Sequence, residues 1–129
     1  MSFGFFDEPP PGYKRDIKDL VKKFSKSEIE INKSIESVLK NPTDAEEYRG
    51  FENLDVRKFK APITHYDISK RQGLRFIYFV IEKTVFPLLV YHRHDAKNQK
   101  NTNSKIKERM NWYKEIIPLF TSKKDDPTR

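Results

Sequence analysis

The sequence predicts an α+β domain in which an N-terminal helical hairpin packs on a small antiparallel sheet of about three to four strands, followed by a C-terminal helix. The helices are expected to cover one face of the sheet. Apolar residues recur at helical spacing over residues 13–39, the period becomes that of extended strands over residues 56–92, and helical spacing returns after residue 103. A chain of 129 residues suits one domain and is too short for two. We expect an N-terminal arm at 1–12, one domain at 13–120 and a flexible tail at 121–129.

The first predicted helix follows an arm that cannot itself be helical. Pro9, Pro10 and Pro11 remove backbone donors and block helical geometry, so the arm forms either a short edge strand or a docking segment. From residue 13 onward one helix face is apolar, and it carries Tyr13, Ile17, Leu20, Val21 and Phe24. This spacing predicts an amphipathic helix.

A second helix is predicted to begin near Ser27. Ser27 and Glu30 have the spacing of a capping box, in which each side chain accepts a hydrogen bond from a backbone N–H at the helix start. The apolar face of this helix consists of Ile31, Ile35, Val38 and Leu39. Asn41 is pushed out of helical geometry by Pro42, which ends the helix. The link around Lys26 is short, so the two helices should form a hairpin.

The first predicted strand follows an acidic loop at residues 43–55. Residues 56–61 alternate in such a way that Lys58 and Lys60 lie on the same face of an extended chain. Two lysines on one face of a strand make a positive stripe on the sheet.

Two further strands are predicted to form a hairpin. Residues 74–81 are almost continuously apolar, as in the centre of a sheet, and Arg75 is their only charged residue. A short connection leads to residues 85–92, so the two segments should pair as antiparallel neighbours. Pro87 lacks a backbone donor and therefore indicates an unpaired or bulged side of the third strand.

The last predicted element is a helix after a polar, turn-rich stretch at residues 93–103. Its apolar face carries Ile106, Met110, Tyr113 and Ile117. Pro118 is expected to end it.

The positive charge of the chain is concentrated in its second part. Residues 1–55 contain 9 Lys and Arg against 12 Asp and Glu, a net charge of −3, whereas residues 56–129 contain 17 against 7, a net charge of +10. A basic excess confined to the predicted sheet and last helix is typical of a face that binds a polyanion. The alternative is a basic surface that serves only solubility.

Several classes of chemistry are excluded or disfavoured by composition. The chain has no cysteine, so it has no disulfide, thiolate nucleophile or cysteine zinc site, which suits a cytoplasmic protein. It lacks the GxxxxGK, GxGxxG, HExxH and GxSxG patterns, and three histidines make a zinc site improbable. We expect no metal and no cofactor. Neither a signal peptide nor a membrane-spanning stretch is indicated.

Two groups of polar residues stand out as sites. His92, Arg93 and His94 follow the last predicted strand, where imidazoles can transfer protons and an arginine can neutralise a phosphate; equally, they can be exposed polar residues at a strand end. Lys58 and Lys60 can face the same groove as Arg75, unless Arg75 instead forms a buried ion pair with a carboxylate of the acidic loop. The aromatic residues among these cations are typical of surfaces that stack bases, and also of a core.

Three stretches of the sequence resemble the RelE/ParE toxin superfamily, over about residues 11–120. PPPGYKRDIKDLVKKF is similar to the first helix of that family, and RGFENLDVRKFKA is similar to its passage into a basic strand. QGLRFIYFVIEKTVFPLLVYHRHDAKN is the most specific of the three: a glycine, an arginine, an aliphatic-tyrosine strand, a hairpin, a second apolar strand ending in tyrosine, and a basic turn.

The resemblance implies a function and a site. Toxins of the RelE branch enter the ribosomal A site and cleave messenger RNA, and a cognate antitoxin silences them; contact with DNA is only indirect, through the antitoxin complex. Lys58 and Lys60 match the paired basic residues of the family, Arg75 matches the arginine of its Gly-x-Arg strand, and Arg93 or His94 matches the basic residue after the last strand.

The chemistry implied is attack of a ribose 2′-hydroxyl on the neighbouring phosphate, which leaves a 2′,3′-cyclic phosphate and a free 5′-hydroxyl. Lysine or histidine would accept the proton, Arg75 and Arg93 would stabilise the developing charge, and His92 or His94 would donate a proton to the leaving oxygen. Family members that cut RNA often have a tyrosine or histidine at or near the C-terminus, and no counterpart of it is found after His94. The segment at 62–71 is also longer than in compact members, and the N-terminal arm with three phenylalanines is additional.

Two other functions are compatible with the same resemblance. The ParE branch inhibits DNA gyrase without cutting nucleic acid, and a catalytically silent module of this fold would only bind RNA or protein. The feature that discriminates is whether Lys58, Lys60 and Arg75 converge with the turn at 92–94 on one concave surface; scattering favours the binding module.

Overall fold

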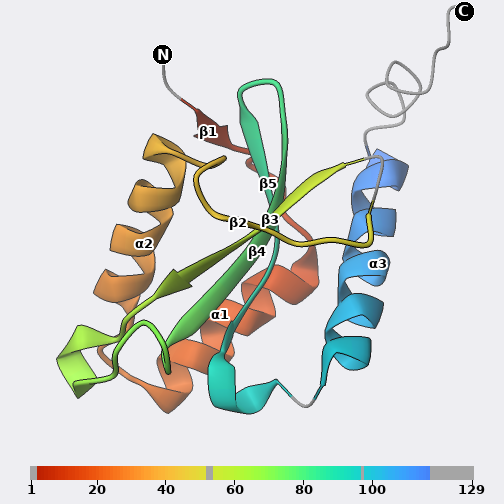
Figure 1. Cartoon of the computed structure of the whole chain (residues 1–129). Helices are drawn as coiled ribbons and strands as arrows, with labels where there is room; N and C mark the ends of the chain where they lie inside the picture. The colour runs from red at the N-terminus through yellow and green to blue at the C-terminus, as the bar shows by residue number, and fades with distance from the viewer. Residues whose placement is uncertain (1–2, 52–53, 97, 117–129) are drawn as a thin grey trace, which may run out of the picture.

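A computed structural model describes residues 3–51, 54–96 and 98–116 of the chain. Three α-helices and five strands form an α+β domain, as the sequence predicts (Figure 1). The elements in chain order are β1 (Gly4–Phe5), α1 (Pro11–Lys23), α2 (Glu28–Lys40), β2 (Glu46–Glu47), β3 (Asp55–Ala61), η1 (Thr64–Tyr66), β4 (Leu74–Ile81), β5 (Thr84–His92), η2 (Arg93–Asp95) and α3 (Gln99–Ile116). Helices α1 and α2 and strands β3, β4 and β5 therefore lie where the sequence predicts two helices and three strands, but a strand, β1, precedes them.

The sheet is larger than expected, and it is mixed rather than antiparallel. Its strand order is β1-β5-β4-β3-β2, and β1 runs parallel to β5 while the other pairs are antiparallel. The two additional strands are β1, from the N-terminal arm, and β2, from the acidic loop. Each has only two residues, which is too short for an alternating pattern to be recognised.

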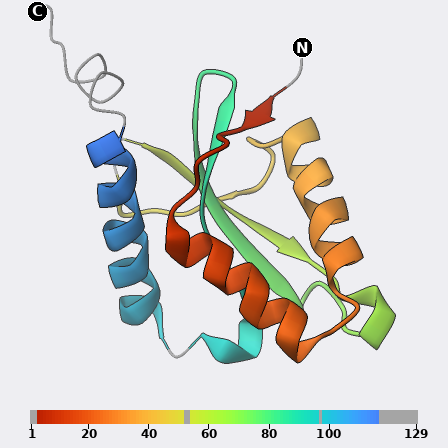
Figure 2. The same cartoon turned by 180° about the vertical axis from the view of Figure 1, so that it is seen from behind.

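Helices cover both faces of the sheet, so the expectation of one covered face was wrong. Phe76 and Tyr78 of β4 belong to a core with α1 and α2, whereas Ile77 and Phe79 belong to a second core with Ile106 and other residues of α3. Seen from behind, α1 lies across the sheet (Figure 2). Burial on both faces is the physical reason that β4 is almost continuously apolar.

The β4–β5 hairpin contains the irregularity that Pro87 indicates. Ile77 pairs with Leu89 and Tyr78 pairs with Pro87, so Leu88 is an extra residue in β5. The extra residue forms a bulge, in agreement with the prediction.

The predicted capping box at the start of α2 is wrong. Ser27 is buried in the turn between the helices, and its hydroxyl donates to the carbonyl of Leu20 at 3.5 Å. Glu30 accepts hydrogen bonds from the Thr64 hydroxyl and, at 3.1 Å, from the backbone N–H of His65. Tertiary partners in α1 and η1 have replaced the local pairing.

Helix α3 begins at Gln99, inside the stretch that was expected to be turn-rich. The side chain of Asn98 accepts a hydrogen bond from the backbone N–H of Asn101 at 2.8 Å, which caps the helix start. As predicted, Ile106, Met110 and Tyr113 are buried against the sheet. Ile117, Pro118 and the expected tail at 121–129 lie outside the described residues. Within the described ranges, no helix has the length and apolar character to cross a membrane.

Strand β1 pairs with only the first two residues of β5. Further along the same edge of β5, an ion pair from two helices hydrogen-bonds to the backbone of the strand. Asp16 of α1 accepts a hydrogen bond from the backbone N–H of Val90 at 3.1 Å, and Arg109 of α3 donates to the carbonyl of Leu88 at 3.0 Å and to Asp16. Gly12 lies against this pair: a Cβ there would lie 2.7 Å from Nε of Arg109, so a larger residue would have to displace the Arg109 guanidinium. We call this arrangement the edge clamp; it satisfies backbone groups that a missing neighbour strand would leave unpaired.

Candidate functional site

Three of the predicted site residues lie on the same face of the sheet. Lys60 pairs with Arg75 in the register of β3 and β4, and Lys58 pairs with Ile77. Because Ile77 belongs to the core under α3, all three cations point to the side of the sheet that carries α3. We call Lys58, Lys60 and Arg75 the basic face. The expectation that the two lysines share one face is confirmed.

Arg75 is held by three backbone carbonyls. Its side chain is buried, and its guanidinium donates to the carbonyls of Lys70 at 2.9 Å, Arg71 at 2.8 Å and Leu74 at 3.2 Å. Arg75 forms no ion pair with the carboxylates of the acidic loop that lie within the described residues, 43–51 and 54–55. Burial lowers the pKa of Arg75, and Arg93 lowers it further. Arg75 thus braces the turn before β4 and places a fixed positive charge at the end of the basic face.

Both lysines of the basic face contact Glu46 of β2. The Nζ atoms of Lys58 and Lys60 lie 3.8 and 3.6 Å from the Glu46 carboxylate, and Lys58 also lies over the Tyr48 ring at 5.8 Å. The Lys58 side chain is 23% exposed, whereas Lys60 is 44% exposed and Glu46 55% exposed. A solvent anion or phosphate can therefore reach Lys60 directly. Sequence reasoning missed Glu46, although an acidic residue just before a basic strand was a usable signal.

Two tyrosines border the basic face. Tyr91 of β5 pairs with Arg75 in register, and burial raises the pKa of Tyr91 while Arg75 lowers it. The Tyr48 hydroxyl donates to Asn103 of α3 at 2.6 Å, which ties the end of β2 to the last helix. Tyr48 and Asn103 were not anticipated from sequence. Both tyrosine rings are only partly buried, so they offer aromatic surface beside the cations.

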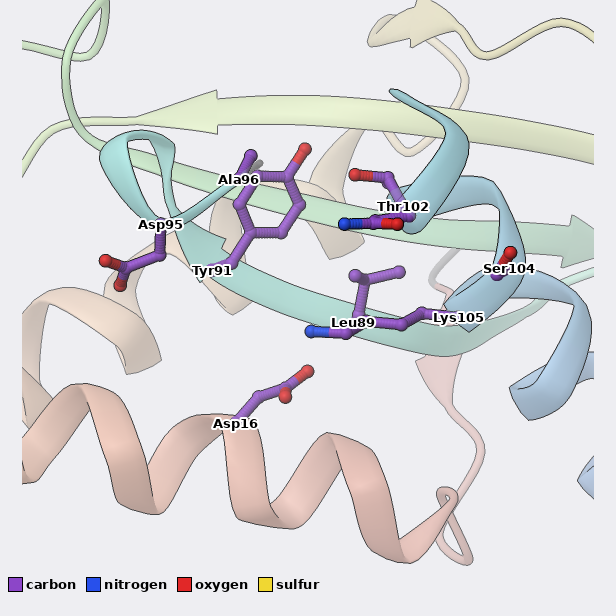
Figure 3. A pocket seen from close by; sticks show the side chains of 9 residues that line it. Asp16, Leu89, Tyr91, Asp95, Ala96, Thr102, Ser104 and Lys105 are labelled. Carbon is purple, nitrogen blue, oxygen red and sulfur yellow. The ribbon is translucent and has the colours of Figure 1, made fainter. Parts of the chain in front are cut away.

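A second feature near Tyr91 is a cavity of about 360 Å³ (Figure 3). It lies between α1, the edge of β5 and the start of α3. It is lined by Asp16, Leu89, Tyr91, Asp95, Ala96, Asn101, Thr102, Ser104 and Lys105. Figure 3 shows Asp16 approaching from α1 and Lys105 approaching from α3. Burial raises the pKa of Asp16, and its hydrogen bond with Arg109 opposes that rise. The cavity thus combines an apolar floor with several polar groups on its walls.

The histidines do not join the basic face. His92 pairs with Leu74, whose side chain belongs to the core under α1 and α2, so His92 points to the opposite side from Arg75. It is 6% exposed, and its Nδ1 lies 3.1 Å from Nζ of Lys23. The His94 ring packs edge-on against it at 5.0 Å.

Arg93 remains near the basic face. Its backbone N–H bonds to the carbonyl of Gly73 at 2.9 Å, and its charge is close enough to lower the pKa of Arg75. The six predicted residues therefore divide: Lys58, Lys60 and Arg75 share the basic face, Arg93 donates to the Gln72 side chain at 3.4 Å near its Arg75 end, and His92 and His94 pack against each other. They do not converge on a single surface, because His92 lies one residue further along β5 than Tyr91 and so faces the other side.

The pKa of His92 provides a test of its buried position. Burial lowers this pKa and the charge of Lys23 lowers it further, so Lys23→Gln is expected to raise it toward the ordinary value of about 6.5. The folded state disfavours the protonated ring. The neutral His92 ring therefore contributes its full stability above the unfolded-state pKa of about 6.5, and this contribution is lost as the pH falls through the lower pKa of the folded state. NMR titration of the imidazole signals measures the shift. Lys22→Gln, a neighbouring exposed charge, is the control; an equal shift in both variants would contradict the assignment.

Comparisons with models of known protein families, with curated proteins and with solved structures each found no match to this chain. Among the residues that the structure describes, no group of three or more histidine, cysteine, aspartate or glutamate side chains is arranged to hold a metal ion. The basic face is the largest group of cations that the predicted site residues form in this structure.

Proposed function

We propose that this protein is the toxin component of a toxin–antitoxin system, a RelE-like endoribonuclease that cleaves messenger RNA on the ribosome and so inhibits translation. The observation that carries the proposal is the basic face: Lys58, Lys60 and Arg75 lie side by side on two paired strands, with Arg93 at the margin. Cations in this arrangement suit the phosphates of a nucleic-acid backbone, and the partly exposed tyrosines beside them suit stacked bases.

In the proposed reaction the 2′-hydroxyl of one ribose loses its proton to water and its oxygen attacks the next phosphate; the bond to the 5′-oxygen breaks, and that oxygen takes up a proton from water. Lys58 and Lys60 bind the phosphate and stabilise its extra negative charge, and Arg75 adds a positive charge that is fixed by three carbonyls. His92 is turned away, so it takes no part. His94 packs against His92, apart from the basic face, so neither histidine is assigned to proton donation.

The proposed partners follow from charge and from the need for control. A net charge of +7 favours binding to the ribosome and its messenger RNA. A cognate antitoxin with an acidic or amphipathic segment would silence the toxin, and DNA would be contacted only through that complex. The reaction needs no metal ion, and we place it in the cytoplasm.

A second candidate is a catalytically silent RNA-binding module. It is favoured by the separation of both histidines from the basic face, because scattering of the predicted residues is what distinguishes a binding module. The Glu46 carboxylate, which offsets part of the lysine charge, favours it as well. In this case RNA would bind to the basic face without being cut.

The proposal is tested by induced expression in a bacterial host, with growth curves and primer-extension mapping of a reporter messenger RNA. Growth arrest with discrete cuts in translated RNA, both lost in Lys60→Ala, would support the toxin. Arrest without cuts would point to a gyrase inhibitor of the ParE type, and the absence of any effect would point to the silent module. Lys33→Ala, an exposed lysine of α2, is the matched control and should behave as the wild type.

A further inference from the structure

The carboxylate of Glu46 lies between the two lysines of the basic face. It is 3.8 Å from Nζ of Lys58 and 3.6 Å from Nζ of Lys60. Glu46 also pairs directly with Lys58 in the register of β2 and β3, so the backbone keeps its side chain on this face. A phosphate that bound both lysines would have to occupy the same space.

This contact differs from the ion pairs that support the fold. Arg109 and Asp16 are both largely buried, with side chains 11% and 16% exposed, and they hydrogen-bond to each other and to backbone groups. Glu46 is 55% exposed, and both of its distances to lysine exceed hydrogen-bond length. Exposed pairs of this kind contribute little to stability. Folding therefore does not account for a carboxylate at this position.

The position of Glu46 also makes it easy to displace. Strand β2 has two residues, both exposed, and it lies at the end of the sheet. The next residue, Glu47, pairs with Arg57 and therefore points to the opposite face. A change of side-chain rotamer is sufficient to move the Glu46 carboxylate into solvent, because no hydrogen bond within the described part of the chain holds it.

We propose that Glu46 occupies the subsite of one RNA phosphate and acts as a built-in competitor, which the phosphate displaces when RNA binds to Lys58 and Lys60. This inference rests on the proposed function of the basic face. Its consequence is that the free protein binds RNA more weakly than its lysines allow, so tight binding requires RNA that also fills neighbouring contacts. Free phosphate and other small anions, which make no neighbouring contacts, would then bind to the basic face only weakly.

The test measures binding of a fluorescein-labelled 12-nucleotide single-stranded RNA by anisotropy at a fixed salt concentration. Glu46→Gln keeps the shape of the side chain and removes its charge, and it is expected to tighten binding by about 3- to 10-fold. Glu47→Gln removes the same charge one residue away on the other face, and it should change the affinity by less than about 2-fold. Thermal unfolding of each variant checks that the fold is retained.

A double-mutant cycle separates a local from a general effect of charge. In the Lys58→Ala/Lys60→Ala background, Glu46→Gln should no longer tighten binding, because the competitor has lost the groups for which it competes. Equal gains in Glu46→Gln and Glu47→Gln, or a gain that persists without the lysines, would overturn the inference and leave RNA binding intact. Loss of RNA cleavage in Glu46→Gln without tighter binding would also overturn it, and would give Glu46 a role in proton transfer. Failure of every variant to bind RNA would remove this inference together with the proposed function.

Discussion

Alanine at both Lys58 and Lys60 is expected to lower the rate of RNA cleavage by about 100- to 1,000-fold, because the transition state carries more negative charge than the bound RNA and loses two nearby cations. Both residues lie on β3, and within 3–51, 54–96 and 98–116 the ionic and ring contacts of their side chains are with the exposed Glu46 and the Tyr48 ring, so the fold should be retained. Single-turnover cleavage of a messenger RNA in a purified translation system measures the rate.

The same substitution should also change the salt dependence of RNA binding. Each phosphate contact with single-stranded RNA contributes about 0.7 to the slope of log affinity against log salt, so the loss of two contacts should reduce the slope by about 1.4. The matched control is Lys14→Ala/Lys18→Ala, which removes two exposed charges from α1. If the control reduces cleavage and salt dependence as strongly as the variant, the basic face is not the RNA site.

Arg109→Ala is expected to lower the free energy of unfolding by about 3–5 kcal/mol, which is the usual result of leaving one charge of a buried pair without its partner. The substitution leaves Asp16 uncompensated and removes the donor to the carbonyl of Leu88. Urea unfolding followed by circular dichroism measures the loss. Lys107→Ala, an exposed residue on α3, is the control, and an equal effect of both substitutions would refute the edge clamp.

The destabilisation by Arg109→Ala should depend on pH. Burial already raises the pKa of Asp16, and Arg109 opposes the rise, so its removal should raise this pKa further. A carboxyl group with a raised pKa in the folded state favours folding when protonated and loses that contribution as the pH increases through the folded-state value. The deficit should therefore be largest near neutral pH and should shrink as the pH falls. Asp16→Asn/Arg109→Met, which leaves no buried charge, should recover most of the stability.

Much of the secondary structure could be read from periodicity, because long amphipathic segments repeat the same burial pattern several times. Helices α1 and α2 and the three long strands appear where the sequence predicts them. The two-residue strands β1 and β2 could not be found in this way, because each is stabilised by a neighbour that is distant in sequence. The local capping signal at Ser27 and Glu30 was misleading for the same reason, since tertiary partners took both side chains.

The sequence predicted which residues of one strand share a face of the sheet, but it did not predict which residues of different strands lie on the same face. Alternation alone placed Lys58 and Lys60 on the same face. It could not place His92, because the bulge at Leu88 shifts the alternation of β5 by one residue, and only the paired structure shows which face follows. The sequence shows that Glu46 is acidic and precedes the basic strand, but it does not show that the carboxylate lies between Lys58 and Lys60.

The sequence by itself determined the α+β class, the positions of helices α1 and α2 and of the three long strands, and the concentration of basic charge in the second part of the chain. These features follow from side-chain period and composition, which act locally. Only the tertiary structure decided that helices cover both faces, that carbonyls hold Arg75, that Glu46 sits between two lysines and that His92 is turned away from them. Each of these depends on strand register and on packing between distant segments, which no local pattern specifies.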